Sequence, residues 1–213
     1  KKLKNIWVSN GYMSQSCLTA ILPRLRPSFA KASVGKPGSG GQAYLDAANI
    51  DLKSMDENFY LKNCGAKLKP VLTNLISLKK AGVHLEITTL VIPKLSDGLG
   101  MLKKIAEFIA RKLSPDTPWH VSRFSPDVSW KLDDAPATPE ETIFKAHEIG
   151  KKAGLKYVYT GNVYNTDKEN TYCPNCSTLA IKRLGYDIIR YDKAGHCAKC
   201  RTDLKILPLA RGS

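Results

Sequence analysis

Hydrophobic residues recur along the chain in two alternating patterns, the two-residue period of β-strands and the wider spacing of amphipathic helices. Strands are predicted over residues 6–9, 47–54, 83–92, 119–124 and 155–160. Helices are predicted over residues 13–25, 56–61, 70–81 and 101–113, and again after Thr138, which is the expected N-cap residue. Strands that alternate with helices predict a parallel α/β sheet or barrel, and about five strands make that barrel incomplete.

The predicted strand over residues 47–54 carries a different kind of side chain on each face. Alternation places Ile50 and Leu52 on one face and Asp51 and Lys53 on the other. Because ligands of parallel α/β proteins gather at the carboxyl ends of strands, Asp51 and Lys53 are candidate binding residues. A solvent-exposed polar edge would produce the same pattern.

Residues 26–44 depart from both patterns, because they are rich in Pro, Ser, Gly, Lys and Ala. This segment contains too little apolar surface to fold on its own, so the sequence predicts an inserted flexible loop. A phosphate-binding loop is the alternative interpretation. It is disfavoured because Gly35-Lys36 lacks the flanking glycine and the Ser or Thr that follow in such loops.

The chain is basic, with 33 Lys and Arg against 19 Asp and Glu and a formal net charge of +14. Such a charge is compatible with an anionic substrate, a nucleic acid or a charged partner protein. The basic pairs are scattered over predicted helices, which favours solvated faces and disfavours nucleic acid. The sequence has no apolar run of transmembrane length and no secretory signal, so it predicts a cytoplasmic protein without a membrane partner.

Two Cys-x-x-Cys pairs near the end of the chain carry the most specific chemistry. Cys173 and Cys176 are separated by 20 residues from Cys197 and Cys200, the spacing of a zinc ribbon. Four thiolates leave no open coordination position, so the predicted Zn²⁺ is structural. Rubredoxin-type iron and an iron–sulfur cluster use the same ligands and stay open at this point. The other two cysteines, at positions 17 and 64, are predicted to be buried apolar residues.

Six short motifs occur in a fixed order along the chain. They are Asn10-Gly11-Tyr12, Asp51-Leu52-Lys53, Thr88-Thr89-Leu90-Val91-Ile92-Pro93, Trp119-His120-Val121-Ser122-Arg123-Phe124, Tyr157-Val158-Tyr159-Thr160-Gly161-Asn162-Val163 and Asn170-Thr171-Tyr172-Cys173-Pro174-Asn175-Cys176. Together these motifs resemble the radical S-adenosylmethionine (SAM) enzymes of the AmmeMemoRadiSam type, which are similar to pyruvate formate-lyase-activating enzymes. The resemblance covers nearly the whole chain outside residues 26–44.

The resemblance implies a fold and a reaction. The fold would be α/β, an incomplete (β/α)6 radical SAM barrel over residues 1–165, followed by a zinc-ribbon-like module over residues 166–209. In such enzymes a [4Fe-4S] cluster held by a Cys-x3-Cys-x2-Cys loop cleaves SAM to a 5′-deoxyadenosyl radical, which abstracts a hydrogen atom. The family also implies a protein substrate or a Memo-like partner.

The resemblance further implies a set of SAM-binding residues at the ends of strands. They are Asn10, Asp51, Lys53, Val91, Ile92, His120 and Arg123, with Val91 and Ile92 near the adenine. By its chemistry, Asp51 can accept a hydrogen bond from a ribose hydroxyl or the methionyl ammonium group. Lys53 can pair with the methionyl carboxylate.

Two elements of the family pattern are missing from this sequence. It contains no Cys-x3-Cys-x2-Cys loop and no Gly-Gly-Glu segment, and both would precede Lys1. We therefore expect an N-terminally truncated enzyme that has no catalytic residue of its own and is inactive as an isolated chain. An upstream fragment would supply the cluster. The alternatives are a basic zinc-ribbon protein that binds nucleic acid, with Lys182, Arg183, Arg190, Lys199 and Arg201 near the cysteines, and an inactive remnant.

Overall fold

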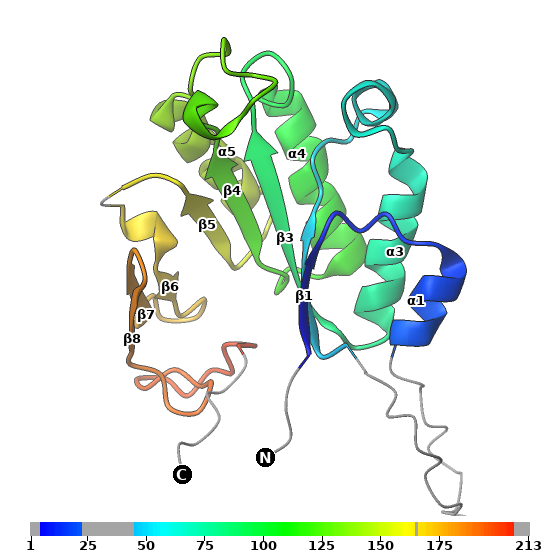
Figure 1. The fold of residues 1–213 in the computed structure, drawn as a ribbon. Coiled ribbons are helices and arrows are strands. Elements are labelled where there is room, and N and C mark those ends of the chain that lie inside the picture. Colours follow the sequence, from blue (N-terminus) through cyan, green and yellow to red (C-terminus); the bar gives the residue numbers. More distant parts are fainter. Residues whose placement is uncertain (1–4, 23–44, 165, 207–213) are drawn as a thin grey trace, which may run out of the picture. The chain divides into compact units, whose positions relative to one another are not determined.

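The computed structural model describes residues 5–22, 45–164 and 166–206 (Figure 1). The strands and helices are, in chain order, β1 (Ile6–Ser9), α1 (Gln15–Ile21), β2 (Ala47–Asp51), α2 (Glu57–Phe59), α3 (Leu68–Lys80), β3 (His84–Val91), α4 (Leu99–Phe108), β4 (Trp119–Arg123), α5 (Glu140–Lys152), β5 (Val158–Gly161), β6 (Thr171–Tyr172), β7 (Leu179–Leu184) and β8 (Asp187–Arg190). Shorter helical turns are η1 (Tyr60–Cys64), η2 (Ile109–Leu113), η3 (Pro126–Val128) and η4 (Asp167–Glu169). The predicted insertion at residues 26–44 lies outside the described residues.

The strands form a five-stranded sheet in the order β1-β2-β3-β4-β5 and a three-stranded sheet in the order β6-β7-β8. In the larger sheet β1 and β2, β2 and β3, and β4 and β5 pair in parallel. The smaller sheet is antiparallel. The predicted α/β class is therefore confirmed. Strand order follows chain order without the reversal of a doubly wound sheet, which is the order found in a segment of a βα barrel.

The chain divides into two compact units, residues 1–88 and 89–213. In the first unit, β1 and β2 are followed by the helices α1 and α3. Helix α3 presents Val71, Leu75 and Leu78 to the core at helical spacing, and all three are fully buried. Strand β2 contributes the buried Ile50 to the same core. The polar face of β2 is only partly buried, as the alternation over residues 47–54 predicts.

In the second unit, helix α5 packs closely on β4 and β5. A Cβ atom added at Gly150 would lie 2.9 Å from the ring of the fully buried Trp119 and 2.8 Å from Val158. The indole Nε1 of Trp119 donates a hydrogen bond of 3.0 Å to Thr89 Oγ1, which satisfies its only polar group. Glycine at position 150 thus permits the close approach of helix to strand.

The three-stranded sheet has a small core of its own and also contacts β5. Its buried residues are Cys173, Ala180, Ile181, Cys197 and Leu204. The hydroxyls of Tyr159 and Thr171 lie 2.9 Å apart, and the Arg183 guanidinium lies 5.1 Å from the centre of the Tyr159 ring.

The domain boundary predicted near residue 165 stays a prediction. None of the helices in the described ranges combines the length and apolarity needed to cross a membrane.

Two local predictions were wrong. Thr138 does not cap helix α5, which begins after Pro139, because the Thr138 hydroxyl bonds to backbone groups elsewhere. Cys17 is exposed, since Leu18 and Ile21 occupy the buried positions of α1, and Cys64 is only partly buried.

Candidate functional site

The four cysteines of the tail lie on two turns that repeat the same backbone pattern. The amide of Cys173 donates to the carbonyl of Thr178, and the amide of Cys197 donates to the carbonyl of Thr202, each over 2.9 Å. Ser177 and Arg201, which follow the second cysteine of each pair, have positive φ angles of 55° and 59°. Each turn therefore folds back so that its two thiols face the same point.

The four sulfur atoms all lie within 4.8 Å of one another. The Sγ atoms of Cys173 and Cys200 are 3.5 Å apart, and those of Cys176 and Cys197 are 3.6 Å apart. A tetrahedral ion with Zn–S bonds of about 2.3 Å places its ligands roughly 3.8 Å apart, so this spacing suits one metal ion. A [4Fe-4S] cluster, in which each cysteine binds a different iron atom, needs more widely separated thiolates.

Two threonines close to the cysteines lower the pKa values of two of the thiols. The hydroxyl of Thr202 lies 3.2 Å from Cys200 Sγ, and that of Thr178 lies 3.3 Å from Cys176 Sγ. Hydrogen bonding to Thr202 lowers the pKa of Cys200 to about 5, and bonding to Thr178 lowers the pKa of Cys176. Burial raises the pKa of Cys173 to about 11. The sequence signal for these threonines is their shared position, two residues after each Cys-x-x-Cys pair.

In the first unit, Asp51 and Lys53 lie together at the carboxyl end of β2. Lys53 Nζ is 2.9 Å from Asp51 Oδ2, and both side chains are about one-third exposed, at 37% and 33%. Asn49 lies two residues before Asp51 on β2, and its Oδ1 accepts a 2.7 Å hydrogen bond from the hydroxyl of Thr88, the residue opposite Asp51 on β3. This polar face is accessible to a ligand, and it offers both an acceptor and a cation.

Asn10, the third predicted residue of the first unit, is exposed in the loop after β1. Its Oδ1 accepts a 3.0 Å hydrogen bond from the amide of Tyr12. The buried Asn74 of α3 holds this loop, because its Nδ2 donates to the carbonyls of Gly11 and Met13 over 2.9 Å each. Asn74 was not predicted as a site residue, although a polar residue within the apolar stripe of a helix is a signal for such a role.

In the second unit, the remaining predicted residues lie on β4 and at or directly after the end of β3. Val91 is fully buried, and the amide of Ile92 donates to Ser96 Oγ over 2.9 Å. The His120 ring lies 5.2 Å from the ring of Tyr159. Arg123 Nε donates to the carbonyl of Thr138 over 2.7 Å, so this guanidinium holds the loop before α5.

Thr138 links the ends of two strands and was not recognised as a site residue. Its fully buried hydroxyl donates to the carbonyl of Val91 over 2.6 Å and accepts from the amide of Phe124 over 3.2 Å. Asn162 completes this region, since its Nδ2 donates to the carbonyl of Arg123 over 2.9 Å. These bonds fix the residues that follow β3, β4 and β5.

Replacing Thr138 with valine is expected to lower the free energy of unfolding by about 2–3 kcal/mol. The substitution keeps the shape of the side chain but leaves the Phe124 amide and the Val91 carbonyl without this partner. Urea denaturation measures the change. Thr73→Val is the matched control, because the Thr73 hydroxyl is exposed and bonds only to the Lys69 carbonyl within its own helix. Equal stability of the two variants would contradict the linking role.

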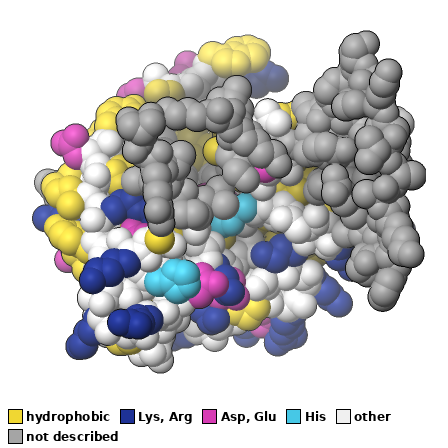
Figure 2. Space-filling model, turned by 90° about the horizontal axis from the view of Figure 1, so that it is seen from below, with side chains coloured by type: hydrophobic (Ala, Val, Ile, Leu, Met, Phe, Trp, Pro, Cys, Tyr) yellow, Lys and Arg dark blue, Asp and Glu magenta, His cyan; other side chains and the backbone are white. Residues whose placement is uncertain are grey.

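Basic side chains do not form one continuous block on the molecular face that Figure 2 shows. Lys and Arg side chains lie there among polar, acidic and apolar ones. On this face, the described side chains agree with the scattered charge expected from the sequence.

Comparisons with known proteins give one close sequence match. The chain is 38% identical over 206 residues to the uncharacterized protein MJ0808 of Methanocaldococcus jannaschii, covering 95% of this chain and 54% of that protein. It therefore spans about half the length of the curated relative it matches. No protein-family profile matches the chain.

Two solved structures show a limited likeness. One is a domain of a pyruvate-formate lyase-activating enzyme from Bacteroides vulgatus, 22% identical, with a TM-score of 0.48 over 55% of this chain and 68% of that chain. The other is a radical SAM methyltransferase from Sphaerobacter thermophilus, 10% identical, with a TM-score of 0.44 over 54% of this chain and 33% of that chain. The α/β class of the protein rests on its own sheet topology.

Proposed function

We propose that this chain is the C-terminal part of a radical SAM enzyme, and that its tail holds a structural zinc ion. The observation that carries the proposal is the position, along the strands, of residues from the sequence motifs. Asn10 follows β1, Asp51 ends β2, Ile92 follows β3 and Arg123 ends β4, so each lies at the carboxyl end of its own strand. That is the end at which parallel βα proteins bind ligands.

Asp51 and Lys53 would contact the methionyl part or the ribose of SAM. The pair already brings an acceptor and an ammonium group within 2.9 Å of each other, and a zwitterionic amino acid could exchange both partners at once. The proposed SAM site also includes four residues from the later strands, with the first two near the adenine: Val91, Ile92, His120 and Arg123. A protein substrate or Memo-like partner stays a proposal as well.

The residues present do not fit a [4Fe-4S] cluster. The sequence has no Cys-x3-Cys-x2-Cys loop, and the four clustered thiols are spaced for one ion. We therefore assign no reaction step to this chain through such a cluster. In the proposed enzyme the cluster ligands would come from outside this sequence.

The zinc assignment rests on the thiol cluster. Four thiolates close the coordination sphere, so the ion would stabilise the fold of the tail and take no part in SAM cleavage. The repeated turns and the hydroxyls of Thr178 and Thr202 would orient the cysteines around it.

Isothermal titration with SAM tests the proposed site. The chain alone is expected to bind SAM with a dissociation constant above roughly 100 μM. Without a cluster, the ligand has only hydrogen bonds and adenine contacts to offset its lost translational freedom. Asp51→Asn and Lys53→Met should each weaken binding by roughly 5–10-fold, the effect of one charge-assisted contact.

The matched control is the pair Asp203 and Lys205, which has the same sequence spacing and an Nζ–Oδ2 distance of 2.7 Å. Asp203→Asn and Lys205→Met should leave SAM binding unchanged. Low-micromolar binding that is insensitive to Asp51 and Lys53 would show that the site lies on other strands.

A further inference from the structure

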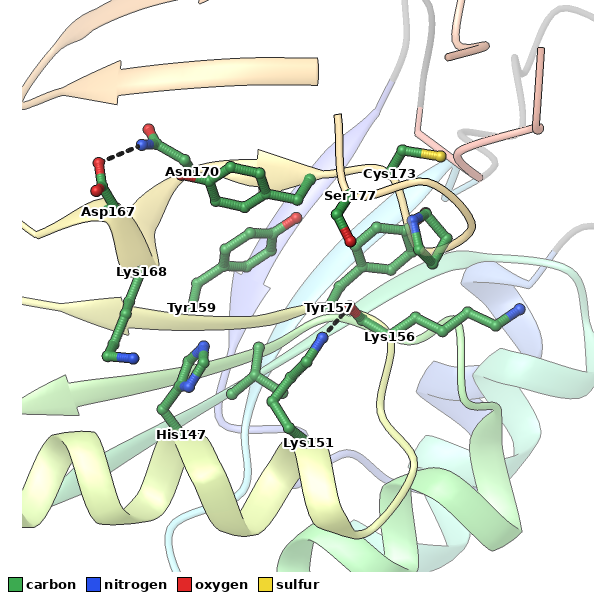
Figure 3. Close-up of a pocket in the computed structure, with 13 residues that line it drawn as sticks. His147, Lys151, Lys156, Tyr157, Tyr159, Asp167, Lys168, Asn170, Cys173 and Ser177 are labelled. Atoms are coloured by element: carbon green, nitrogen blue, oxygen red, sulfur yellow. Dashed lines mark hydrogen bonds between the residues drawn. The ribbon is translucent and has the colours of Figure 1, made fainter. Parts of the chain in front are cut away.

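A cavity of about 330 Å³ lies in the second unit between helix α5, strand β5 and the segment of residues 167–177 (Figure 3). Its volume is at the lower end of the range for small-molecule sites. Except for Cys173, its lining consists of residues outside the predicted metal and SAM sites. The cavity therefore needs a separate explanation.

The charged groups of the lining are mostly cationic. Lys151, Lys156 and Lys168 contribute ammonium groups, and Asp167 contributes the one carboxylate. Lys156 is engaged elsewhere, because its Nζ lies 2.7 Å from Asp116 Oδ1, and in Figure 3 its side chain points away from the labelled residues on α5. Lys151 and Lys168 are the cations left to meet a ligand.

Lys151 forms no ion pair with a described residue, although the exposed Glu148 carboxylate attracts its ammonium group from a greater distance. Its Nζ donates one hydrogen bond of 2.9 Å, to the backbone carbonyl of Lys156. Burial around the ammonium group lowers the pKa of Lys151, although the residue as a whole is exposed. An ammonium group has three N–H donors, so two are left for water or an anion.

Lys168 reaches the same cavity from η4, on the side opposite α5 (Figure 3). Its Nζ lies 3.5 Å from Oε1 of Glu148, an exposed side chain that also contacts His147 Nδ1 at 3.1 Å. The Lys168–Glu148 pair is long and solvent-exposed, so it contributes little stability. An anion inside the cavity could replace Glu148 as the partner of Lys168.

A buried tyrosine also lines the cavity. Tyr157 lines the cavity, is only 4% exposed, and its hydroxyl has no hydrogen-bond partner. Burial raises the pKa of Tyr157, which keeps the hydroxyl protonated. The hydroxyl oxygen is itself shielded from solvent, so Tyr157 contributes the surface of its ring to the cavity.

We propose that this cavity binds the phosphate group of a small phosphorylated molecule, with Lys151 and Lys168 supplying positive charge from opposite sides. Ammonium groups act as point charges and suit a rounded oxyanion, whereas planar carboxylates are matched by the guanidinium fork. None of the described residues that line the cavity is an arginine. The rings of Tyr157 and Tyr159 form apolar surface for the rest of the ligand. This inference is independent of SAM binding.

Isothermal titration of the chain with inorganic phosphate and with phenyl phosphate, at an ionic strength held constant with chloride, tests the proposal. Both probes should bind saturably, and phenyl phosphate should bind more tightly because its ring packs on the tyrosines. Lys151→Met and Lys168→Met should each weaken binding by roughly 10-fold. Glu148→Gln should tighten binding by about 2–3-fold, because it removes the carboxylate that competes for Lys168.

The matched control is Lys152→Met, which removes an exposed charge from the next position of α5, outside the cavity lining. It should leave both affinities unchanged. Equal weakening by Lys152→Met, or no saturable binding of either probe, would overturn the proposal. So would a short RNA that binds more tightly than phenyl phosphate through the same two lysines. Thermal melts check that each variant is folded. If Lys151→Met unfolds, Lys168→Met still tests the proposal, because it keeps the hydrogen bond from Lys151 to the Lys156 carbonyl.

Discussion

Replacing Cys176 with serine is expected to abolish the binding of about one zinc ion per chain and to unfold the module formed by β6, β7 and β8. The physical reason is the size of its core, which consists of Cys173, Ala180, Ile181, Cys197 and Leu204. Two of these five residues, Cys173 and Cys197, belong to the four-cysteine cluster that could hold the ion. Structural zinc sites contribute about 10 kcal/mol or more of apparent free energy to small modules, far more than this core could supply alone.

Metal analysis of the purified chain, together with thermal melts followed by circular dichroism, measures this effect. Cys17→Ser and Cys64→Ser are the matched controls, because both thiols lie outside the cluster and are exposed or partly buried. Each control should retain the metal and the melting temperature of the parent chain. A stable [4Fe-4S] cluster after anaerobic reconstitution that depends on Cys173 and Cys200 would defeat the zinc assignment, as would full zinc retention by Cys176→Ser.

The parts of the fold with a strong local signal were predictable from the sequence. Residues 83–92 are rich in β-branched residues and give β3 within one residue at each end. The strand predicted over residues 155–160 begins later in the structure, at Val158. The reason is that the Leu155 amide still donates a hydrogen bond to the carbonyl of Gly150 in α5. The four clustered cysteines were predictable because a Cys-x-x-Cys pair has a nearly fixed local geometry.

The residues that the sequence analysis missed act over long separations. Asn74 holds a loop 61 to 63 residues earlier in the chain, and Thr138 bonds to a carbonyl 47 residues away. Thr138 also satisfies every local rule for an N-cap, so the tertiary contact overrode a correct local preference. The lysines of the cavity gave no signal, because a lysine on a helix normally marks a solvated face.

Replacing Gly11 with alanine is expected to lower the free energy of unfolding by about 2–4 kcal/mol. Two separate effects add up at this buried position. The backbone of Gly11 has a φ of +70°, which strains any residue with a Cβ atom, and that atom would lie 2.7 Å from Cγ2 of the buried Ile50. The loop after β1 would have to shift, and Asn10 and the carbonyl bonded to Asn74 lie in the same loop.

Gly82→Ala separates the two effects, because Gly82 has a φ of +80° but an added Cβ atom would meet nothing within 4 Å. This control should cost only about 1 kcal/mol, the cost of backbone strain alone. Urea denaturation of both variants then gives the contribution of the contact with Ile50 as a difference, expected to be at least about 1 kcal/mol. Equal losses in the two variants would mean that the loop relaxes freely. In that case the position of Asn10 would not be fixed by the core of β2, and its proposed contact with SAM would lose its structural support.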